Sequence, residues 1–546
     1  MHTDSMTAST AHPLRTPAFS WAHAARILTV LLLPAVLLLT ACDDDNGDIT
    51  GPGNGDDDPP FSVATYDTTG NVITVSDDEE DLGIGYTDEQ GTAVTEVTWT
   101  NDFIYKLDNF VFVLEGQTLN IEPGTIIKGL PGSGENAAAL IVARGAQIFA
   151  DGNPGSDNPD DADPIIFTAD DDPVEPGMDP SEDVGLGRDV RGLWGGVILL
   201  GDAELNSTPG ETNIEGVPGD ARTLYGGTNN DHDIGVFRFV SIRHTGTQLG
   251  NGDEIQGLTV GGVGNGSTVE FVESYASDDD GFEWFGGTIN HRNMIAAWAS
   301  DDSFDMDEGY RGSNQFWLAV QAGDEAGRIA EQDGGTDPEA GTPYADVRVA
   351  NATYIGIGPE LADANVAGDG NDPFIIHRDN NATSYFASVF MDGRLNAGLQ
   401  IEDLGSGEDS RERWLAGQLR YESNLWWNIG PDFDAATTTF EDLIQLTGDG
   451  DGGEAFRTAL ADYLRDEGNL IGTELPITSM NRDSEGLIVS FNPLAAGEAT
   501  TPPTEPSAFD TGGVNGTYQP VDYHGAFGTD NWARGWTLLS RTGVLE

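Results

Sequence analysis

Short apolar runs separated by Gly, Asn and Asp dominate the pattern of hydrophobic and polar positions from about Val111 onward. Connections as short as Glu122-Pro123-Gly124 and Arg144-Gly145 join these runs. Short apolar runs bounded by turn residues predict β-strands. The first predicted strands span residues 110–114, 118–121, 125–128, 139–142, 146–150 and 164–168. Helical periodicity is scarce, so the pattern predicts an all-β chain.

A repeat in the middle of the chain indicates how the strands are arranged. Residues 277–284 (SDDDGFEW) recur 23 residues later as 300–307 (SDDSFDMD), with one residue dropped. A predicted strand precedes each copy, at 268–275 and 292–298, and another follows at 315–320. Similar strands at a fixed period predict the coils of a parallel β-helix, a solenoid in which each coil buries its inward side chains against the next.

A second set of strands, at 348–355, 385–390 and 420–427, returns at a spacing near 36 residues. These strands predict further coils that carry loop insertions, such as 324–344 and 357–372, because an insertion in a turn does not disturb the stacking. One amphipathic helix is predicted at 454–465, and Gly468 follows it as a stop signal. We expect this short helical element to cap the open end of the solenoid.

The beginning of the chain predicts export and a lipid anchor. Arg15 and Arg26 precede an apolar run at 27–39, which has the length of a signal-peptide core. The only cysteine, Cys42, closes the run Leu-Thr-Ala-Cys, which resembles the lipobox of bacterial lipoproteins. A short signal anchor with an incidental cysteine is the alternative interpretation. Lipidation of Cys42 would anchor the protein to a membrane without a spanning helix.

The segments after Cys42 suggest three parts of the chain. Residues 43–60 are rich in Asp, Gly and Pro and bury no apolar surface, so they predict a disordered tether. The predicted organisation is a lipoprotein signal peptide at 1–42, a tether and lead-in segment at 43–95, and a single β-helix domain with a C-terminal cap at 96–546.

The net charge of the chain limits the classes of molecule that it could bind. The chain has 24 basic and 93 acidic residues, for a formal net charge of −69. Nucleic acid would be repelled, and cations are the natural counterpart. The acidity is explained either by a surface adapted to high salt, where screening relieves the repulsion, or by bound calcium.

The two repeated coils carry the strongest candidate for chemistry, a group of carboxylates. Equivalent positions on neighbouring coils, for which Asp279 and Asp302 are the expected stacked pair, lie about 4.8 Å apart, where unscreened carboxylates repel each other. A calcium ion with six to eight oxygen ligands would remove that repulsion. The alternative is a solvated acidic face. The candidate metal ligands are Asp278, Asp279, Asp280, Asp301, Asp302, Asp305, Asp307 and Glu308.

Aromatic and basic side chains flank this group and suggest a ligand-binding surface. Exposed rings beside polar groups could form a platform for sugars, whereas the alternative places the aromatic side chains in the core. Trp284 and Phe285 are the preferred exposed pair. The predicted ligand-binding residues are Trp284, Phe285, Tyr310, His291, Arg292 and Arg311. The pattern identifies no catalytic residue.

Four strings in the sequence are similar to those of a known family. They are RGLWGGVILLG at 191–201, EIQGLTVGGVG at 254–264, DGFEWFGGT at 280–288 and YHGAFG at 523–528. In this order they resemble a family of exported, often lipid-anchored, right-handed β-helix proteins of outer-membrane bacteria. The resemblance covers roughly residues 108–536. It implies a right-handed, pectin-lyase-like β-helix at the cell surface, and it implies no established activity and no catalytic residues.

These observations leave three functional hypotheses. The leading one is a lipid-anchored, calcium-stabilised module at the outer membrane or cell surface that binds or displays, with an extracellular glycan or an outer-membrane protein as partner. The second is a polysaccharide lyase or glycoside hydrolase, for which Arg243-His244, His291-Arg292 and Arg311 are the basic candidates. The third is a purely structural or adhesive surface protein.

Overall fold

The structure is a computed structural model, and its described residues belong to one compact unit, Pro59–Glu546. It describes residues 66–76, 83–88, 90–215, 217, 220–250, 253–323, 325–335, 338–359, 361, 373–395, 397–504 and 518–546. The predicted signal peptide, Cys42 and the tether at 43–60 lie outside these residues.

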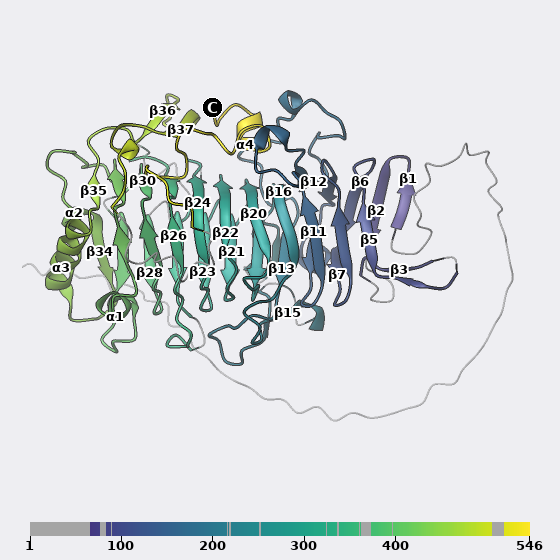
Figure 1. The fold of residues 1–546 in the computed structure, drawn as a ribbon, viewed down its shortest axis with the longest axis horizontal. Coiled ribbons are helices and arrows are strands. Elements are labelled where there is room, and N and C mark those ends of the chain that lie inside the picture. Colours follow the sequence, from purple (N-terminus) through teal and green to yellow (C-terminus); the bar gives the residue numbers. More distant parts are fainter. Residues whose placement is uncertain are drawn as a thin grey trace, which may run out of the picture. The chain divides into compact units, whose positions relative to one another are not determined.

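A sheet of ten parallel strands runs along one side of the coils within the described residues. Each strand pairs with the corresponding strand of the next coil, and Figure 1 shows them side by side along one axis. The strands are β7 (Phe110–Val113), β10 (Ala139–Val142), β13 (Gly196–Leu200), β19 (Leu258–Gly261), β21 (Phe282–Phe285), β23 (Phe304–Asp307), β25 (Ala330–Asp333), β28 (Ile375–Arg378), β31 (Leu399–Glu402) and β34 (Ile444–Thr447).

A second sheet contains nineteen of the described strands and is bent into two faces. In β16, for example, the residues before Phe239 pair with β11 and those after it pair with β12. Phe239 lies at the bend with φ of 48°. The strands are β1 (Tyr66–Thr69), β2 (Val72–Ser76), β5 (Glu96–Trp99), β6 (Ile104–Asp108), β8 (Thr118–Ile121), β9 (Ile126–Gly129), β11 (Gln147–Asp151), β12 (Ile165–Ala169), β16 (Gly235–Arg243), β20 (Thr268–Tyr275), β22 (His291–Ala297), β24 (Ser313–Val320), β26 (Arg348–Ala350), β27 (Thr353–Ile355), β29 (Ser384–Phe386), β30 (Val389–Met391), β32 (Tyr421–Glu422), β33 (Leu425–Trp427) and β35 (Leu470–Ile471).

The strand registers confirm the parallel β-helix. Val349 pairs with Tyr385, and Tyr385 pairs with Tyr421, which is the predicted spacing of 36 residues. The residue dropped from the second acidic turn shortens the spacing to 22 residues, so that Phe282 pairs with Phe304. This register, together with a 2.8 Å bond from the Asp302 amide to Asp280 Oδ1, stacks Asp302 on Asp280. The prediction that Asp302 stacks on Asp279 is therefore wrong, because the extra residue of the first copy lies between Ser277, whose carbonyl accepts from the Ser300 amide at 3.0 Å, and Asp280.

The coils begin before the predicted domain boundary at residue 96. Strand β2 pairs in parallel with β6 and antiparallel with β1, so both strands extend the solenoid into the lead-in segment. Short antiparallel pairs lie outside the two large sheets. They are β3 (Tyr86–Thr87) with β4 (Ala93–Val94), β14 (Thr212–Asn213) with β15 (Leu224–Tyr225), β17 (Gln248–Gly250) with β18 (Asp253–Glu254), and β36 (Ile477–Arg482) with β37 (Ile488–Ala495).

Side chains that alternate inward along the strands fill the coils. Trp284, Phe304 and Trp317 are fully buried, and the rings of Trp284 and Trp317 stack with centroids 5.2 Å apart. The predicted helix is confirmed as α3 (Gly453–Asp466), whose Phe456, Leu460, Ala461 and Leu464 join this core at the end of the solenoid.

Three further helices lie in the described residues: α1 (Ser410–Leu415), α2 (Phe440–Leu443) and α4 (Leu538–Arg541). None of the helices in the described part of the chain combines the length and apolar character needed to cross a membrane.

The C-terminal segment, residues 518–546, returns to cover the bent sheet (Figure 1). Trp536 packs edge-on against Phe239, and the backbone amides of Leu538 and Leu539 donate to Glu273 at 2.7 and 2.9 Å. This contact joins β20 to the first residues of α4.

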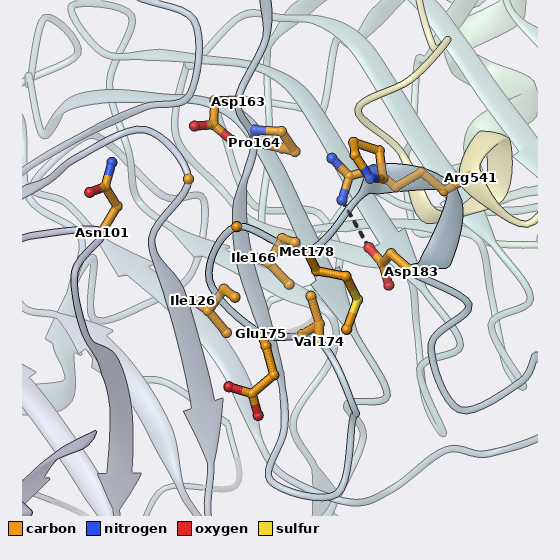
Figure 2. Close-up of a pocket in the computed structure, with 13 residues that line it drawn as sticks. Asn101, Ile126, Asp163, Pro164, Ile166, Val174, Glu175, Met178, Asp183 and Arg541 are labelled. Atoms are coloured by element: carbon orange, nitrogen blue, oxygen red, sulfur yellow. Dashed lines mark hydrogen bonds and ion pairs between the residues drawn. The ribbon is translucent and has the colours of Figure 1, made fainter. Parts of the chain in front are cut away.

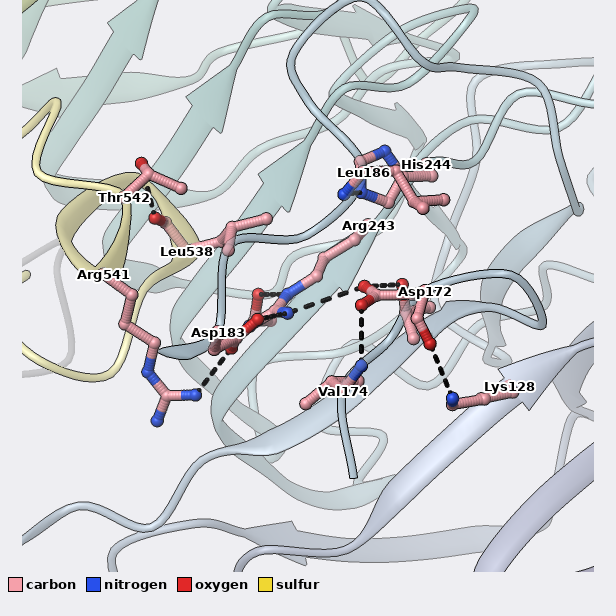
Figure 3. A network of polar contacts seen from close by, with 12 residues as sticks. Lys128, Asp172, Val174, Asp183, Leu186, Arg243, His244, Leu538, Arg541 and Thr542 are labelled. Carbon is pink, nitrogen blue, oxygen red and sulfur yellow. Dashed lines mark hydrogen bonds and ion pairs between the residues drawn. The ribbon is translucent and has the colours of Figure 1, made fainter. Parts of the chain in front are cut away.

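An ionic network lies beneath α4 (Figure 3). The guanidinium of Arg243 is fully buried and donates two hydrogen bonds to Asp183 at 3.0 and 2.9 Å, with Asp172 3.7 Å away. Arg541 of α4 also donates to Asp183, at 2.8 Å. Burial opposes the charge of Arg243, but the carboxylates of Asp183 and Asp172 raise the pKa of its guanidinium.

Candidate functional site

The candidate site lies on the outer face of the ten-stranded sheet, where β21 and β23 leave the acidic turns. Alternation along β21 turns Phe282 and Trp284 into the core and Glu283 outward. The register then places Glu283 opposite Asp305 on β23, and Asp305 opposite Glu331 on β25. Acidic residues therefore stand one above another on successive coils.

Five carboxylates form what we call the acidic cluster: Asp279, Asp280, Glu283, Asp301 and Asp305. Ligand oxygens of Asp280, Glu283 and Asp305 lie within 4.8 Å of one another. The same holds for Asp279, Asp280 and Asp301, so Asp280 belongs to both groups. This spacing allows one cation to contact three carboxylates.

Two oxygens in the acidic cluster, Oε2 of Glu283 and Oδ1 of Asp305, are buried and have no hydrogen-bond partner among the described residues. Glu283 is only 6% exposed. A buried carboxylate oxygen without a donor is unfavourable, since it has lost its hydration without compensation. A divalent cation would satisfy both oxygens.

Burial and mutual repulsion raise the pKa values of four of these carboxyl groups, Asp279, Asp280, Glu283 and Asp305. Burial, with Asp305 and other nearby carboxylates, raises the pKa of Glu283 well above its ordinary value. Burial, with Glu254 and Asp301, raises the pKa of Asp279 to about 7. The pKa of Asp280 is likewise raised, first by burial and then by Asp279. The fold therefore holds these groups where the charged form is costly unless a cation is present.

Arginines at the edge of the acidic cluster are engaged with other carboxylates. Arg328 lies 3.1 Å from Glu331 and 3.9 Å from Asp302. Arg378 pairs with Asp333 at 2.6 Å. These ion pairs compensate the negative charges of carboxylates on and near β25. They do not involve Glu283 or Asp280.

The structure brings together half of the predicted metal ligands. Asp279, Asp280, Asp301 and Asp305 belong to the acidic cluster, and the sequence prediction missed Glu283. Among the described residues, the three-carboxylate groups do not include the other four predicted ligands, which are Asp278, Asp302, Asp307 and Glu308. The alternation of β21, which separates Glu283 from its two inward neighbours, is the signal that could have identified it.

Other structural contacts engage these residues, and Asp307 Oδ1, for example, accepts from the Glu308 amide at 2.6 Å. Glu308 accepts hydrogen bonds from Tyr225 at 2.6 Å and from Ser207 at 2.7 Å, which ties a loop to β23. Asp302 accepts a hydrogen bond from the Arg328 amide. A further group outside the prediction, Glu339, Asp379 and Glu402, also places three ligand oxygens within 4.8 Å.

The predicted aromatic platform is wrong. Trp284 and Tyr310 are fully buried inside the coils and stack with ring centroids 5.5 Å apart. Phe285 points outward but is 5% exposed, because Tyr225 and Leu205 of a covering loop pack on it. The interior of the solenoid is wide enough to hold whole indole rings, so aromatic residues next to acidic turns remain in the core.

The predicted basic ligand-binding residues are engaged in hydrogen bonds or ion pairs with other residues of the protein. His291 is buried and accepts a hydrogen bond from Trp284 Nε1 at 2.9 Å, and burial lowers its pKa to about 4. Arg292 pairs with Glu270 at 2.9 Å and Arg311 with Glu204 at 3.4 Å. His291 is therefore neutral at physiological pH and inaccessible.

The first basic pair considered for an enzyme is likewise buried. Arg243 belongs to the network beneath α4, and His244 is fully buried with Nδ1 2.7 Å from the Val190 carbonyl. Neither side chain is available as a base beside the acidic cluster.

A separate cavity of about 290 Å³ lies beside the ionic network (Figure 2). Ile126, Ile166, Val174 and Met178 supply its apolar surface, and Arg541 and Asp183 meet at one side. None of the predicted site residues lines it.

Comparisons with known proteins identify the family but no close relative. No curated protein matches the chain, and no solved structure matches it. The model of the pectate-lyase-like β-helix domain family matches residues 91–367, just over half of the 546-residue chain. The matched region contains both predicted acidic turns and the strands that carry the acidic cluster. The chain therefore belongs to the pectate-lyase-like β-helix domain family.

Proposed function

We propose that this protein is a calcium-stabilised β-helix that is anchored by lipid at the outer membrane or cell surface and serves there as a binding or display module. The observation that carries the calcium proposal is a pair of buried oxygens in a group of three carboxylates, Glu283 Oε2 and Asp305 Oδ1. In the part of the chain that the structure describes, neither oxygen has a hydrogen-bond partner. Oxygen-only ligands and an extracellular location favour calcium over softer metals.

Calcium is expected to raise the melting temperature of the metal-free protein where sodium at equal ionic strength does not. A ligand that binds only the folded state stabilises it by about 2.7 kcal/mol at a hundredfold excess over Kd. Differential scanning calorimetry with calcium, with sodium and with a chelator measures this increment. Equal effects of the two cations would contradict the proposal and favour a solvated acidic face.

A matched pair of variants makes that experiment specific. Glu283→Gln should remove most of the calcium increment while leaving the metal-free protein equally stable or more stable, because it removes a charge from a group of buried carboxylates. Asp278→Asn, in a neighbouring residue outside the acidic cluster, should retain the increment. Loss of the increment in both variants would point to a general electrostatic effect.

The anchor at Cys42 has its own test. Cys42→Ser should release the protein into the soluble fraction or leave an uncleaved precursor, because the acylated thiol is gone. Fractionation followed by mass spectrometry of the N-terminus measures both results, with Asp45→Asn as the control that keeps the thiol. A Cys42→Ser protein that is cleaved and retained in membranes like the wild type would contradict the lipobox.

The partner is proposed to be an extracellular glycan or an outer-membrane protein, and the net charge of −69 argues against nucleic acid. A polysaccharide lyase or glycoside hydrolase remains the alternative function, and a purely structural or adhesive protein the third. The enzyme alternative has less support, because Arg243, His244 and His291 are buried in other interactions.

A further inference from the structure

A second cavity, of about 400 Å³, lies where the hairpin β36–β37 crosses the turns that follow β27, β30 and β33. Figure 1 shows the hairpin beside the labelled end of β30. Its wall comes from the last residue of β33, Trp427, and from Met480 of β36. The acidic cluster does not contribute to it.

The polar part of this cavity is built from a hydrogen-bonded group. The buried carboxylate of Asp392 accepts from Asn428 Nδ2 at 2.5 Å and from Arg482 Nη2 at 2.7 Å. Arg482 Nη1 also donates to the carbonyls of Ile357 and Gly486, at 2.9 and 2.8 Å. These contacts fix Asn428 and Arg482 before any ligand arrives, which reduces the entropy lost on binding.

The apolar part is an aromatic side chain that the solenoid leaves half-buried. Trp427 pairs with Met391 on the previous coil, and its side chain and those of Met480 and Leu361 line the cavity. An aromatic surface next to fixed amide and carboxylate groups suits a ligand with one apolar face and several hydroxyl groups. A pyranose ring has both features.

The charge of the cavity selects among sugars. Among the described residues that line it, three carry carboxylates, Asp392, Asp483 and Glu485, and one carries a positive charge, Arg482. Uronates and sulfated or phosphorylated sugars would meet net repulsion there. We propose that this cavity binds a neutral pyranose residue of an extracellular oligosaccharide, with Trp427 stacked on the sugar ring. This inference rests on the proposed function, because it assigns a site to the proposed glycan-binding role. It does not require calcium.

Isothermal titration with neutral hexasaccharides of glucose, xylose and mannose, and with hexagalacturonate, tests the proposal. At least one neutral hexasaccharide should bind, and hexagalacturonate should not. Trp427→Ala should raise Kd at least about tenfold, as truncation of a buried tryptophan contact does. Trp427→Phe keeps an aromatic face and should stay within a few-fold of the wild type.

Phe149→Ala is the matched control, because Phe149 is an exposed aromatic side chain (39%) that does not line the cavity. Thermal melts of each variant establish that it is folded. Three outcomes would each overturn the proposal. They are that no neutral sugar binds, that Trp427→Ala binds as the wild type does, or that hexagalacturonate binds more tightly than the neutral sugars and depends on Trp427. Repeating the titrations on metal-free and calcium-loaded protein separates failure of this site from failure of the calcium proposal.

Discussion

Replacing Arg243 with methionine is expected to lower the free energy of unfolding by about 3–5 kcal/mol, because removal of one partner leaves buried charges without compensation. Asp183 would lose two hydrogen bonds, and Asp172 and Glu273 would lose the nearest cation. Methionine preserves most of the volume, so the loss reports the charge and not a cavity. Urea unfolding followed by tryptophan fluorescence measures the effect.

Arg292→Met is the control for this result. Arg292 makes an ion pair with Glu270 on the same sheet, but its side chain is 25% exposed, and pairs of that kind contribute about 0–1 kcal/mol. Equal losses for the two variants would mean that the Arg243 network stabilises no more than a surface pair. Since Arg541 also binds Asp183, the Arg243→Met protein should also lose protection from proteolysis first in the C-terminal segment.

The metal-free protein is expected to be less stable at pH 8 than at pH 6, and calcium should remove most of that difference. Burial and neighbouring carboxylates raise the pKa of Asp279 from an ordinary value of 3.8 to about 7 and raise those of Asp280 and Glu283 well above their ordinary values. The folded state therefore holds more protons than the unfolded state above about pH 4. Stability is fully present below the unfolded pKa and is lost as the pH rises through the folded pKa.

The size of this effect follows from linkage. Each proton that the folded state holds in excess lowers the free energy of unfolding by about 1.4 kcal/mol per pH unit. Calcium replaces those protons, so its stabilising increment should be larger at pH 8 than at pH 6, and binding at pH 6 should release protons. Calorimetry at the two pH values, in buffers of different ionisation enthalpy, measures both quantities.

Buried histidines change the free energy of unfolding with pH in the opposite direction, and the comparison of protein with and without calcium removes their contribution. Burial lowers the pKa of His291 and His377 to about 4, so they favour the folded state as the pH rises through the ordinary histidine range. Their contribution is common to the protein with and without calcium and cancels in the difference. If the stabilisation by calcium does not increase with pH, the prediction that calcium binds the ionised form of the acidic cluster is wrong.

The sequence alone was sufficient for the fold because the evidence for a solenoid is local and repeated. The 36-residue return of strands at Val349, Tyr385 and Tyr421 is a spacing along the chain, and the registers reproduce it. The four-residue spacing of Phe456, Leu460 and Leu464 likewise marks α3 and its buried face. In a solenoid each coil contacts mainly its neighbours, so periodicity and topology carry the same information.

Only the tertiary structure decided which side chains are accessible and which distant segments meet. Trp284 adjoins an acidic turn in the sequence, yet the width of the coil interior buries it, whereas Glu283 beside it turns outward to the acidic cluster. Leu538 reaches Glu273, and Arg482 closes the cavity over Trp427, through contacts between segments far apart in the chain. No local pattern encodes such contacts, because they depend on where the C-terminal hairpin and tail lie over coils that are distant in the sequence.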